Sequence, residues 1–144
     1  MDYFDKADIV IKAAAVSDFR PKKSFSKKIK KEGKELRLDL ERTPDILEEM
    51  GQKKGKRILV GFAAETEDMI ENAKEKMRKK NLDLIVANDV SKKDTGFQSD
   101  VNKAFLISKH GKVKELPVMM KSLLAREVFD AVVKMLFDKK RKRK

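Results

Sequence analysis

The sequence contains no cysteine and no tryptophan, and His110 is the single histidine among its 144 residues. Without cysteine, the chain can form neither a disulfide framework nor a thiolate metal site. One histidine excludes a multi-histidine metal site and leaves little room for Ser-His-Asp catalysis. Because His110 precedes Gly111 between two short strand-like runs, we interpret it as a turn residue.

Long hydrophobic runs and glycine-rich phosphate motifs are also absent. No apolar stretch approaches the roughly 20 residues of a membrane span, and the chain does not open with a signal peptide, so we expect a cytoplasmic protein with no membrane partner. Neither GxGxxG nor GxxxxGK[ST] occurs, which disfavours a nicotinamide dehydrogenase. Residues 1–7 resemble the tail of a helix. We therefore expect the first strand or strands and the glycine-rich turn of a nucleotide-binding fold to be lacking.

Charge, in contrast, is abundant: 42% of the residues are charged, and the formal net charge is +12. Half of that net charge lies in the run of lysine and arginine at 139–144, and such terminal runs are usually disordered. We predict a folded body at 1–138 and a disordered basic tail at 139–144. The tail could contact phosphates, but it has no aromatic residue to stack on bases, so specific nucleic-acid binding is not expected. The positive charge of the body favours an anionic ligand.

Three continuous apolar runs predict strands buried on both faces of a mainly parallel sheet. They span residues 8–16, 57–64 and 82–87, and acidic or amide residues follow each of them. In an open α/β sheet, the ligand crevice lies outside the carboxyl ends of such strands. The runs alternate with predicted helices, which indicates an α/β fold, a Rossmann-like three-layer sandwich. Further predicted elements are a half-exposed strand at 35–41, a hairpin at His110–Gly111, and helices at 43–54, 67–80 and 122–137.

The predicted helices carry start signals and apolar stripes. Thr43 suits the N-cap of the first helix and Pro44 its first position, and Thr66 is the expected cap of the second. The buried face of the second helix should contain Met69, Ile70, Ala73 and Met77. The stripe predicted for the last helix is Leu124, Val128, Ala131, Val132, Met135 and Leu136.

Asp18 and a lysine-rich loop form the strongest candidate site visible in the residues themselves. Lys22, Lys23 and the lysines between 27 and 34 follow the first buried strand and border the crevice into which Asp18 should point. Such a loop suits a triphosphate, and Asp18 could hold Mg²⁺. The alternative is an ordinary solvated surface. From the residues alone, a purely structural interpretation also applies to four other residues. Lys76 and Lys80 would be solvent-facing, Phe62 would be a core residue, and Asp45 would favour a helix start.

Six ordered segments then carry a family resemblance. Together they resemble the C-terminal part of phosphopantothenate–cysteine ligase, the ligase half of the bifunctional bacterial coenzyme A biosynthesis protein, over roughly residues 7–133. No single segment is decisive, but six in order with family-like gaps are highly specific. The segments are Ala14–Pro21, Lys28–Lys31, Thr43–Ile46, Gly61–Thr66, Asn88–Ser91 and Gly96–Asn102.

The resemblance implies an activity and a set of site residues. The family joins 4′-phosphopantothenate to cysteine, using CTP and Mg²⁺, through an acyl-cytidylate. By resemblance, Lys28 is the catalytic residue that neutralises phosphate charge, and Asp18 is the metal ligand. The residues that the resemblance implies for CTP binding are Lys12, Ala13, Ala14, Asp18, Lys28, Pro44, Asp45, Ile46, Leu47, Phe62, Lys76 and Lys80.

Two departures from the family pattern qualify these expectations. Thr43 stands where the family usually has asparagine, so any contact made by an asparagine side chain is in doubt. The N-terminal half of the ligase domain is absent, and we expect the chain alone to be inactive or impaired. The expected partners are 4′-phosphopantothenate, cysteine, CTP, a second copy in a homodimer, and a missing N-terminal half or decarboxylase domain. The alternative function is a non-catalytic α/β module that binds nucleotide or RNA and carries a basic tail.

Overall fold

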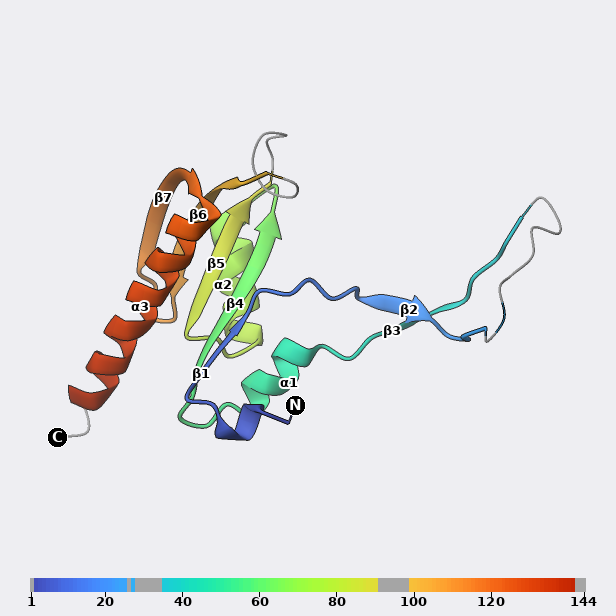
Figure 1. Ribbon diagram of the computed structural model, residues 1–144, viewed down its shortest axis with the longest axis horizontal. Helices are drawn as coiled ribbons and strands as arrows, with labels where there is room; N and C mark the ends of the chain where they lie inside the picture. The colour runs from blue at the N-terminus through green and yellow to red at the C-terminus, as the bar shows by residue number, and fades with distance from the viewer. Residues whose placement is uncertain (1, 26, 28–34, 91–98, 142–144) are drawn as a thin grey trace. The chain divides into compact units, whose positions relative to one another are not determined.

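The computed structural model describes residues 2–25, 27, 35–90 and 99–141 (Figure 1). The chain divides into two compact units. The first, which we call the body, comprises Met1–Ala13 and Leu47–Lys144. The second, which we call the insert, comprises Ala14–Ile46. The folded region predicted over residues 1–138 thus includes both units.

A five-stranded sheet forms the centre of the body, in the order β1-β4-β5-β6-β7. The β1–β4 and β4–β5 pairs are parallel, whereas β5–β6 and β6–β7 are antiparallel. Four of the five strands consequently run in the same direction, which confirms the predicted mainly parallel sheet. The strands are β1 (Ile9–Lys12), β4 (Ile58–Glu65), β5 (Leu84–Asp89), β6 (Val101–Ser108) and β7 (Val113–Met120).

One face of the sheet is covered by α3 (Lys121–Arg141), which packs along it in Figure 1. The predicted stripe is confirmed: Leu124, Val128 and Val132 are buried in the core on this face. The other three predicted residues, Ala131, Met135 and Leu136, are half-buried and pack against that core. Apolar strand residues complete it, so the hydrophobic effect holds α3 to the sheet.

The opposite face is covered by α1 (Ile46–Gln52) and α2 (Met69–Lys79). The predicted α2 face is also confirmed, with Ala73 and Met77 buried and Met69 and Ile70 packed at the edge of the core. Helices on both faces of the sheet give the predicted Rossmann-like three-layer sandwich. A short 3₁₀ helix, η1 (Phe4–Lys6), precedes β1.

The hairpin prediction is confirmed at the turn between β6 and β7. Gly111 has a φ of 82°, and its N–H donates to the carbonyl oxygen of Ser108. The left-handed conformation favours glycine because a Cβ would crowd the backbone there. His110 is therefore an exposed turn residue, as predicted.

The ends of several predicted elements were wrong. β1 stops at Lys12 rather than at residue 16, because the chain beyond Ala13 leaves the sheet for the insert. The strand expected at 35–41 is β3 (Leu40–Arg42), which pairs with β2 (Phe19–Pro21) as a separate two-stranded sheet. The helix expected from Thr43 is α1, which begins at Ile46.

Both predicted caps were wrong, and hydrogen bonds to residues distant in the sequence explain the result for Thr43. The Thr43 hydroxyl donates to the carbonyl oxygen of Ser17, and its N–H donates to that of Asp18. Thr43 thus extends the strand pairing of the insert. The N-cap of α2 is Asp68, in the left-handed conformation and with no side-chain capping bond, instead of Thr66.

The predicted disordered tail is partly helical, since α3 continues through Arg141. Contacts made by Lys139 attach the start of this segment to the rest of the body. Its Nζ donates to the carbonyl oxygens of Lys56 and Arg57 and lies 3.8 Å from a carboxylate oxygen of Asp83. The rest of the predicted tail, residues 142–144, lies outside the described residues.

Candidate functional site

The carboxyl ends of β1 and β4 bring several predicted site residues together. Lys12 is the last residue of β1 and pairs with Gly61 of β4, and Ala13 follows directly. β4 runs four residues further, to Glu65, paired there with β5 alone. Phe62 is the first residue of this extension. The end of β1 and the extension of β4 therefore meet at the edge where open α/β sheets bind their ligands.

Leu47 lies over the same point of the sheet. It is 6% exposed and belongs to the core on the α1–α2 face. A Cβ added to Gly61 would lie 2.8 Å from Leu47 Cδ2. The absence of a side chain at Gly61 thus lets α1 approach β4 closely, and the start of α1 lies beside Lys12 and Gly61.

Phe62 is half-buried and packs against the core on the α3 face. Part of its ring therefore contributes to folding, as the residues alone suggested. The remainder of the side chain is accessible at the carboxyl edge, which leaves its implied contact with a nucleotide sterically open.

Lys76 has an ionic partner that its own helix does not provide. Its Nζ lies 2.6 Å from Oε1 of Glu65, the last residue of β4. The Glu65 side chain is 9% exposed and that of Lys76 is 48% exposed. The sequence has no acid three or four residues before Lys76 within α2. The acidic partner of Lys76 instead comes from β4. Glu65 is one of the acids noted at the strand ends, but its pairing with Lys76 is visible only in the tertiary structure.

Lys80 lies apart from Phe62. It follows α2 on the face opposite α3, and its carbonyl oxygen approaches Gly51 of α1. Close by, the N–H of Asp83 bonds to the carbonyl oxygen of Leu59, near the amino end of β4. The body therefore does not place Lys80 beside Phe62, although both were predicted to contact one nucleotide.

The insert brings together its own predicted residues. Asp18 is exposed and precedes β2. Its carbonyl oxygen accepts the N–H of Thr43, so Asp18 lies next to the segment that contains Pro44 and Asp45. Arg20 and Glu41 pair across the two strands at 2.8 Å. Ala14 and Ile46 are exposed residues at the two ends of the insert, whereas the catalytic candidate Lys28 lies outside the described residues.

No group of three metal-ligating side chains occurs in the described part of the chain. Asp18 thus provides a single carboxylate. Mg²⁺ is commonly held by one or two carboxylates together with substrate phosphates and water. The donor set fits a magnesium ion that arrives with a nucleotide and does not fit a metal caged by the protein alone.

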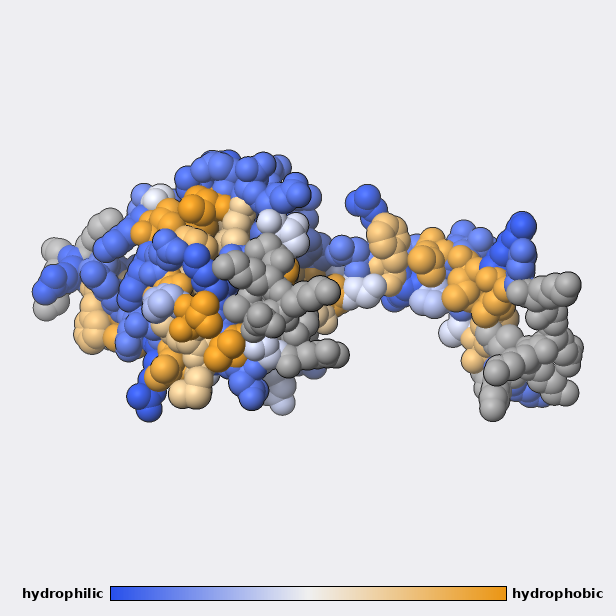
Figure 2. All heavy atoms as spheres, turned by 90° about the horizontal axis from the view of Figure 1, so that it is seen from above, coloured by the Kyte–Doolittle hydropathy of each residue, from blue (hydrophilic) through white to orange (hydrophobic). Residues whose placement is uncertain are grey.

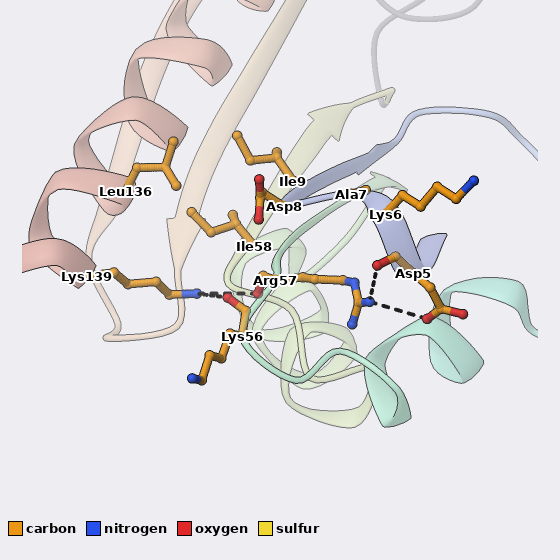
Figure 3. A pocket seen from close by; sticks show the side chains of 10 residues that line it. All are labelled: Asp5, Lys6, Ala7, Asp8, Ile9, Lys56, Arg57, Ile58, Leu136 and Lys139. Atoms are coloured by element: carbon orange, nitrogen blue, oxygen red, sulfur yellow. Dashed lines mark hydrogen bonds and ion pairs between the residues drawn. The ribbon is translucent and has the colours of Figure 1, made fainter. Parts of the chain in front are cut away.

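A pocket of about 700 Å³ lies at the other end of the sheet, beside the first residues of β1 and β4 (Figure 3). Two of its cationic side chains are already engaged. Arg57 donates to the carbonyl oxygens of Phe4 and Asp5 and to the Asp5 carboxylate, and Lys139 donates to backbone carbonyls. Since these groups stabilise the fold, we do not place the site here.

Asp83 is a buried acid that the sequence analysis did not identify. Its side chain is 1% exposed. Oδ2 accepts the Leu59 N–H at 3.0 Å and lies 3.2 Å from Lys54 Nζ, and Oδ1 lies 2.9 Å from Lys109 Nζ. Burial alone raises the pKa of this carboxyl, but the backbone N–H and the two lysines outweigh burial and hold the pKa below its ordinary value. Asp83 joins β4, the β6–β7 hairpin and the loop after α1.

Within residues 2–25, 27, 35–90 and 99–141, no helix is both long and apolar enough to cross a bilayer.

The sheet and the helices on both of its faces define a Rossmann-like α/β domain, in which β1 and β4 end at the edge where such folds commonly bind ligands. Residues 1–136 match the model of the DNA/pantothenate metabolism flavoprotein C-terminal domain. This chain belongs to that family.

Two curated relatives show the extent of the similarity. The chain is 48% identical over 132 residues to the coenzyme A biosynthesis bifunctional protein CoaBC of Bacillus subtilis (strain 168), a match that covers 92% of this chain and 32% of the relative. It is 44% identical over 128 residues to the CoaBC protein of Borreliella burgdorferi, covering 87% of this chain and 32% of the relative. The chain thus spans about a third of the length of these relatives.

A solved structure agrees with the fold. The crystal structure of the C-terminal domain of a coenzyme A biosynthesis bifunctional protein CoaBC superimposes with a TM-score of 0.76 at 39% identity. The match covers 95% of this chain and 59% of that structure's chain.

Proposed function

We propose that this chain is the nucleotide-binding portion of a ligase that joins 4′-phosphopantothenate to cysteine in coenzyme A biosynthesis, with CTP as co-substrate. The observation that carries this proposal is the similarity along nearly the whole chain to bifunctional coenzyme A biosynthesis proteins. The conjunction of Lys12, Ala13 and Phe62 at the carboxyl edge of the sheet supports it. So does the neighbouring placement of Asp18 and the Pro44–Asp45 segment within the insert.

The proposed mechanism has two steps. The carboxylate of 4′-phosphopantothenate attacks the α-phosphorus of CTP, which releases pyrophosphate and leaves an acyl-cytidylate. The amine of cysteine then attacks the acyl carbon, and CMP leaves. Lys28 would neutralise the negative charge that develops on the phosphate during the first step. Backbone N–H groups near Asp45 would donate to the ligand. A bound Mg²⁺, held by Asp18 and the phosphates, would supply Lewis-acid polarisation of the phosphate oxygens.

The outer edge of β1 supports the proposal that a further polypeptide segment completes the enzyme. Among the described strands, in the order β1-β4-β5-β6-β7, β1 lies at the edge and has a neighbour on one side only. Its sequence, Ile9 to Ile11 followed by Lys12, is apolar in the manner of an interior parallel strand. We propose that a strand from an N-terminal segment outside this chain pairs with β1. The isolated chain would accordingly be inactive or impaired.

The insert supports the proposed homodimer. Its described residues expose many large apolar side chains, and Figure 2 shows apolar atoms gathered on the face of the insert in view. Contiguous exposed apolar surface marks interaction sites in soluble proteins. The exposed residues are Val16, Phe19, Phe25, Leu36, Leu38 and Leu40.

Calorimetric titration with nucleotides tests the proposed function directly. In Mg²⁺, the chain should bind CTP and should bind NADH more weakly. Asp18→Asn and Lys28→Ala should each weaken CTP binding by about tenfold or more, because each removes a charged contact worth about 1.5–3 kcal/mol. The Asp18→Asn effect should vanish in EDTA. NADH binding as tight as CTP binding would overturn the proposal, and unchanged CTP affinity in both variants would reject the site. A basic RNA-binding module would instead bind RNA and ignore CTP.

The Lys76–Glu65 pair provides a second prediction. Lys76→Met should weaken CTP binding about tenfold, since it removes a cation proposed to contact the nucleotide. Glu65→Gln breaks the same ion pair but leaves the Lys76 ammonium free for the ligand, so CTP affinity should be retained or raised. Arg78→Met, an exposed change on the same helix, is the matched control. Equal losses in Lys76→Met and Glu65→Gln would show that the pair only maintains the fold.

A further inference from the structure

Two asparagines at the carboxyl edge of the sheet have buried amide oxygens that accept no hydrogen bond within the described part of the chain. They are Asn88, near the end of β5, and Asn102, near the start of β6. Asn102 is 5% exposed, and neither Oδ1 accepts a hydrogen bond from the described residues. Buried side-chain polar atoms in folded proteins nearly always have a partner, so two such atoms in one region require an explanation.

The two side chains are neighbours on one face of the sheet. Asn88 pairs with Ala104 of β6, and Asn102 precedes Ala104 by two residues in the same strand. The β6–β7 register shifts between Asn102 and Ala104, but the extra residue is in β7, where the partners are Met119 and Leu116. β6 itself therefore keeps its alternation, so Asn102 and Ala104 lie on the same face, and diagonal neighbours such as Asn88 and Asn102 are about 7 Å apart. This is the α3 face, because Ala104 belongs to the core beneath α3.

A small, exposed residue adjoins Asn88 on β4. This neighbour is Ala64, and Phe62 lies on the same face two residues earlier. On the other side, β7 ends opposite Val101, and the N–H of Lys121, the first residue of α3, donates to the carbonyl oxygen of Asp100. The asparagines thus lie between the accessible edge of β4 and the start of α3, on the face where Phe62 marks the proposed nucleotide site.

The chemistry of the pair restricts its ligand. An amide oxygen is an uncharged acceptor, so the ligand must present N–H or O–H groups. A carboxylate in this position would favour an ammonium ion and raise the pKa of a bound amine. Two neutral acceptors bind N–H groups and favour the ammonium form less than a carboxylate does. They suit an amine that must be in its neutral form to react.

We propose that Asn88 and Asn102 bind the amino group of the cysteine co-substrate; this rests on the proposed function. Neither asparagine is among the residues assigned to CTP or Mg²⁺. In the step concerned, the lone pair of the neutral amine forms the new C–N bond to the acyl carbon. The C–O bond of the acyl-cytidylate breaks, its electron pair leaves on the phosphate oxygen of CMP, and one amine proton passes to water.

Steady-state kinetics of the ligase, assembled with the polypeptide segment that the proposed function requires, tests this assignment. Asn88→Leu and Asn102→Leu keep approximate side-chain size but lose the acceptor. Each should raise the KM for cysteine at least tenfold and leave the KM for CTP unchanged. Asn72→Leu, which changes an asparagine of α2, is the control. Unchanged KM for cysteine would overturn the assignment and indicate an ordered water only, and a selective rise in the KM for CTP would overturn it as well.

An isosteric change separates amine binding from a structural role. Asn102→Asp retains an acceptor but adds a charge that stabilises the ammonium form. The rise of kcat/KM for cysteine with pH should therefore shift to higher pH by about one unit, with the folded state retained by circular dichroism. An unshifted profile would overturn the assignment. Titrating the unmodified protein with CTP distinguishes this failure from failure of the proposed function, because the function predicts CTP binding whatever the role of the asparagines.

Discussion

Asp83→Ala should lower the free energy of unfolding by about 3–5 kcal/mol, which is the cost of removing one partner of a buried charge network. The variant leaves the Leu59 N–H without its acceptor. It also leaves the Lys54 ammonium, whose side chain is 9% exposed, without its carboxylate. The carbonyl oxygen of Asn81 still accepts a bond from Lys54, but a neutral oxygen does not replace the lost charge.

Urea unfolding of the body, followed by circular dichroism at pH 7, measures this effect. Glu75→Ala provides the control, since Glu75 is an exposed acid on α2, and its removal should change stability by less than about 0.5 kcal/mol. A loss below about 1 kcal/mol for Asp83→Ala would mean that water replaces the carboxylate and that the network is dispensable.

The pH dependence of stability provides an independent measure of the same interaction. The folded-state pKa of Asp83 lies below its ordinary value. Its contribution is therefore complete above the unfolded pKa of about 3.9 and is lost as the pH falls through the lower folded pKa. Asp83→Asn keeps the shape of the side chain but has no charge to lose. The stability difference between this variant and the unmodified protein should be constant between pH 5 and 7 and should shrink below about pH 4.

Gly51→Ala should destabilise the body by about 3 kcal/mol, at the upper end of the range for overpacking. A Cβ on Gly51 of α1 would lie 2.0 Å from the carbonyl oxygen of Lys80 and 2.8 Å from its carbonyl carbon. Both are backbone atoms, so no side-chain rotation relieves the overlap, and α1 has to move away from the end of α2. That movement would also weaken the bond from Asn81 Nδ2 to the carbonyl oxygen of Gly51.

Gly111→Ala is the matched comparison for this prediction. At Gly111 φ is 82° and an added Cβ would meet nothing within 4 Å, so only the left-handed backbone opposes the change, at a cost of about 1 kcal/mol. Thermal unfolding of the two variants should show the larger loss for Gly51→Ala. If both lose the same small amount, the helices can separate freely and the contact does not define their packing.

Local sequence patterns predicted the elements that have a continuous apolar run or a regular apolar stripe. The continuous apolar runs identified β4 and β5, and the stripe from Leu124 to Leu136 identified the buried side of α3. The ordered family segments predicted the fold class and the residues of the carboxyl edge. Element ends were predicted less well. Thr43 has the residue type of a helix cap, but it bonds to Ser17 and Asp18, which lie 25 and more positions earlier in the chain.

By itself, the sequence determined the layered α/β architecture, because hydrophobic periodicity acts within each segment and needs no knowledge of the others. It also determined the family, through the order and spacing of six short segments. Only the tertiary structure decided which charges meet. Glu65 of β4 pairs with Lys76 of α2, and Asp83 binds lysines from separate elements. The pairing of Asn88 with Ala104, two residues after Asn102, likewise follows from the packing of the strands. The reason is that electrostatic and hydrogen-bonding partners must be close in space. Residues far apart in the sequence become close only when strands and helices pack.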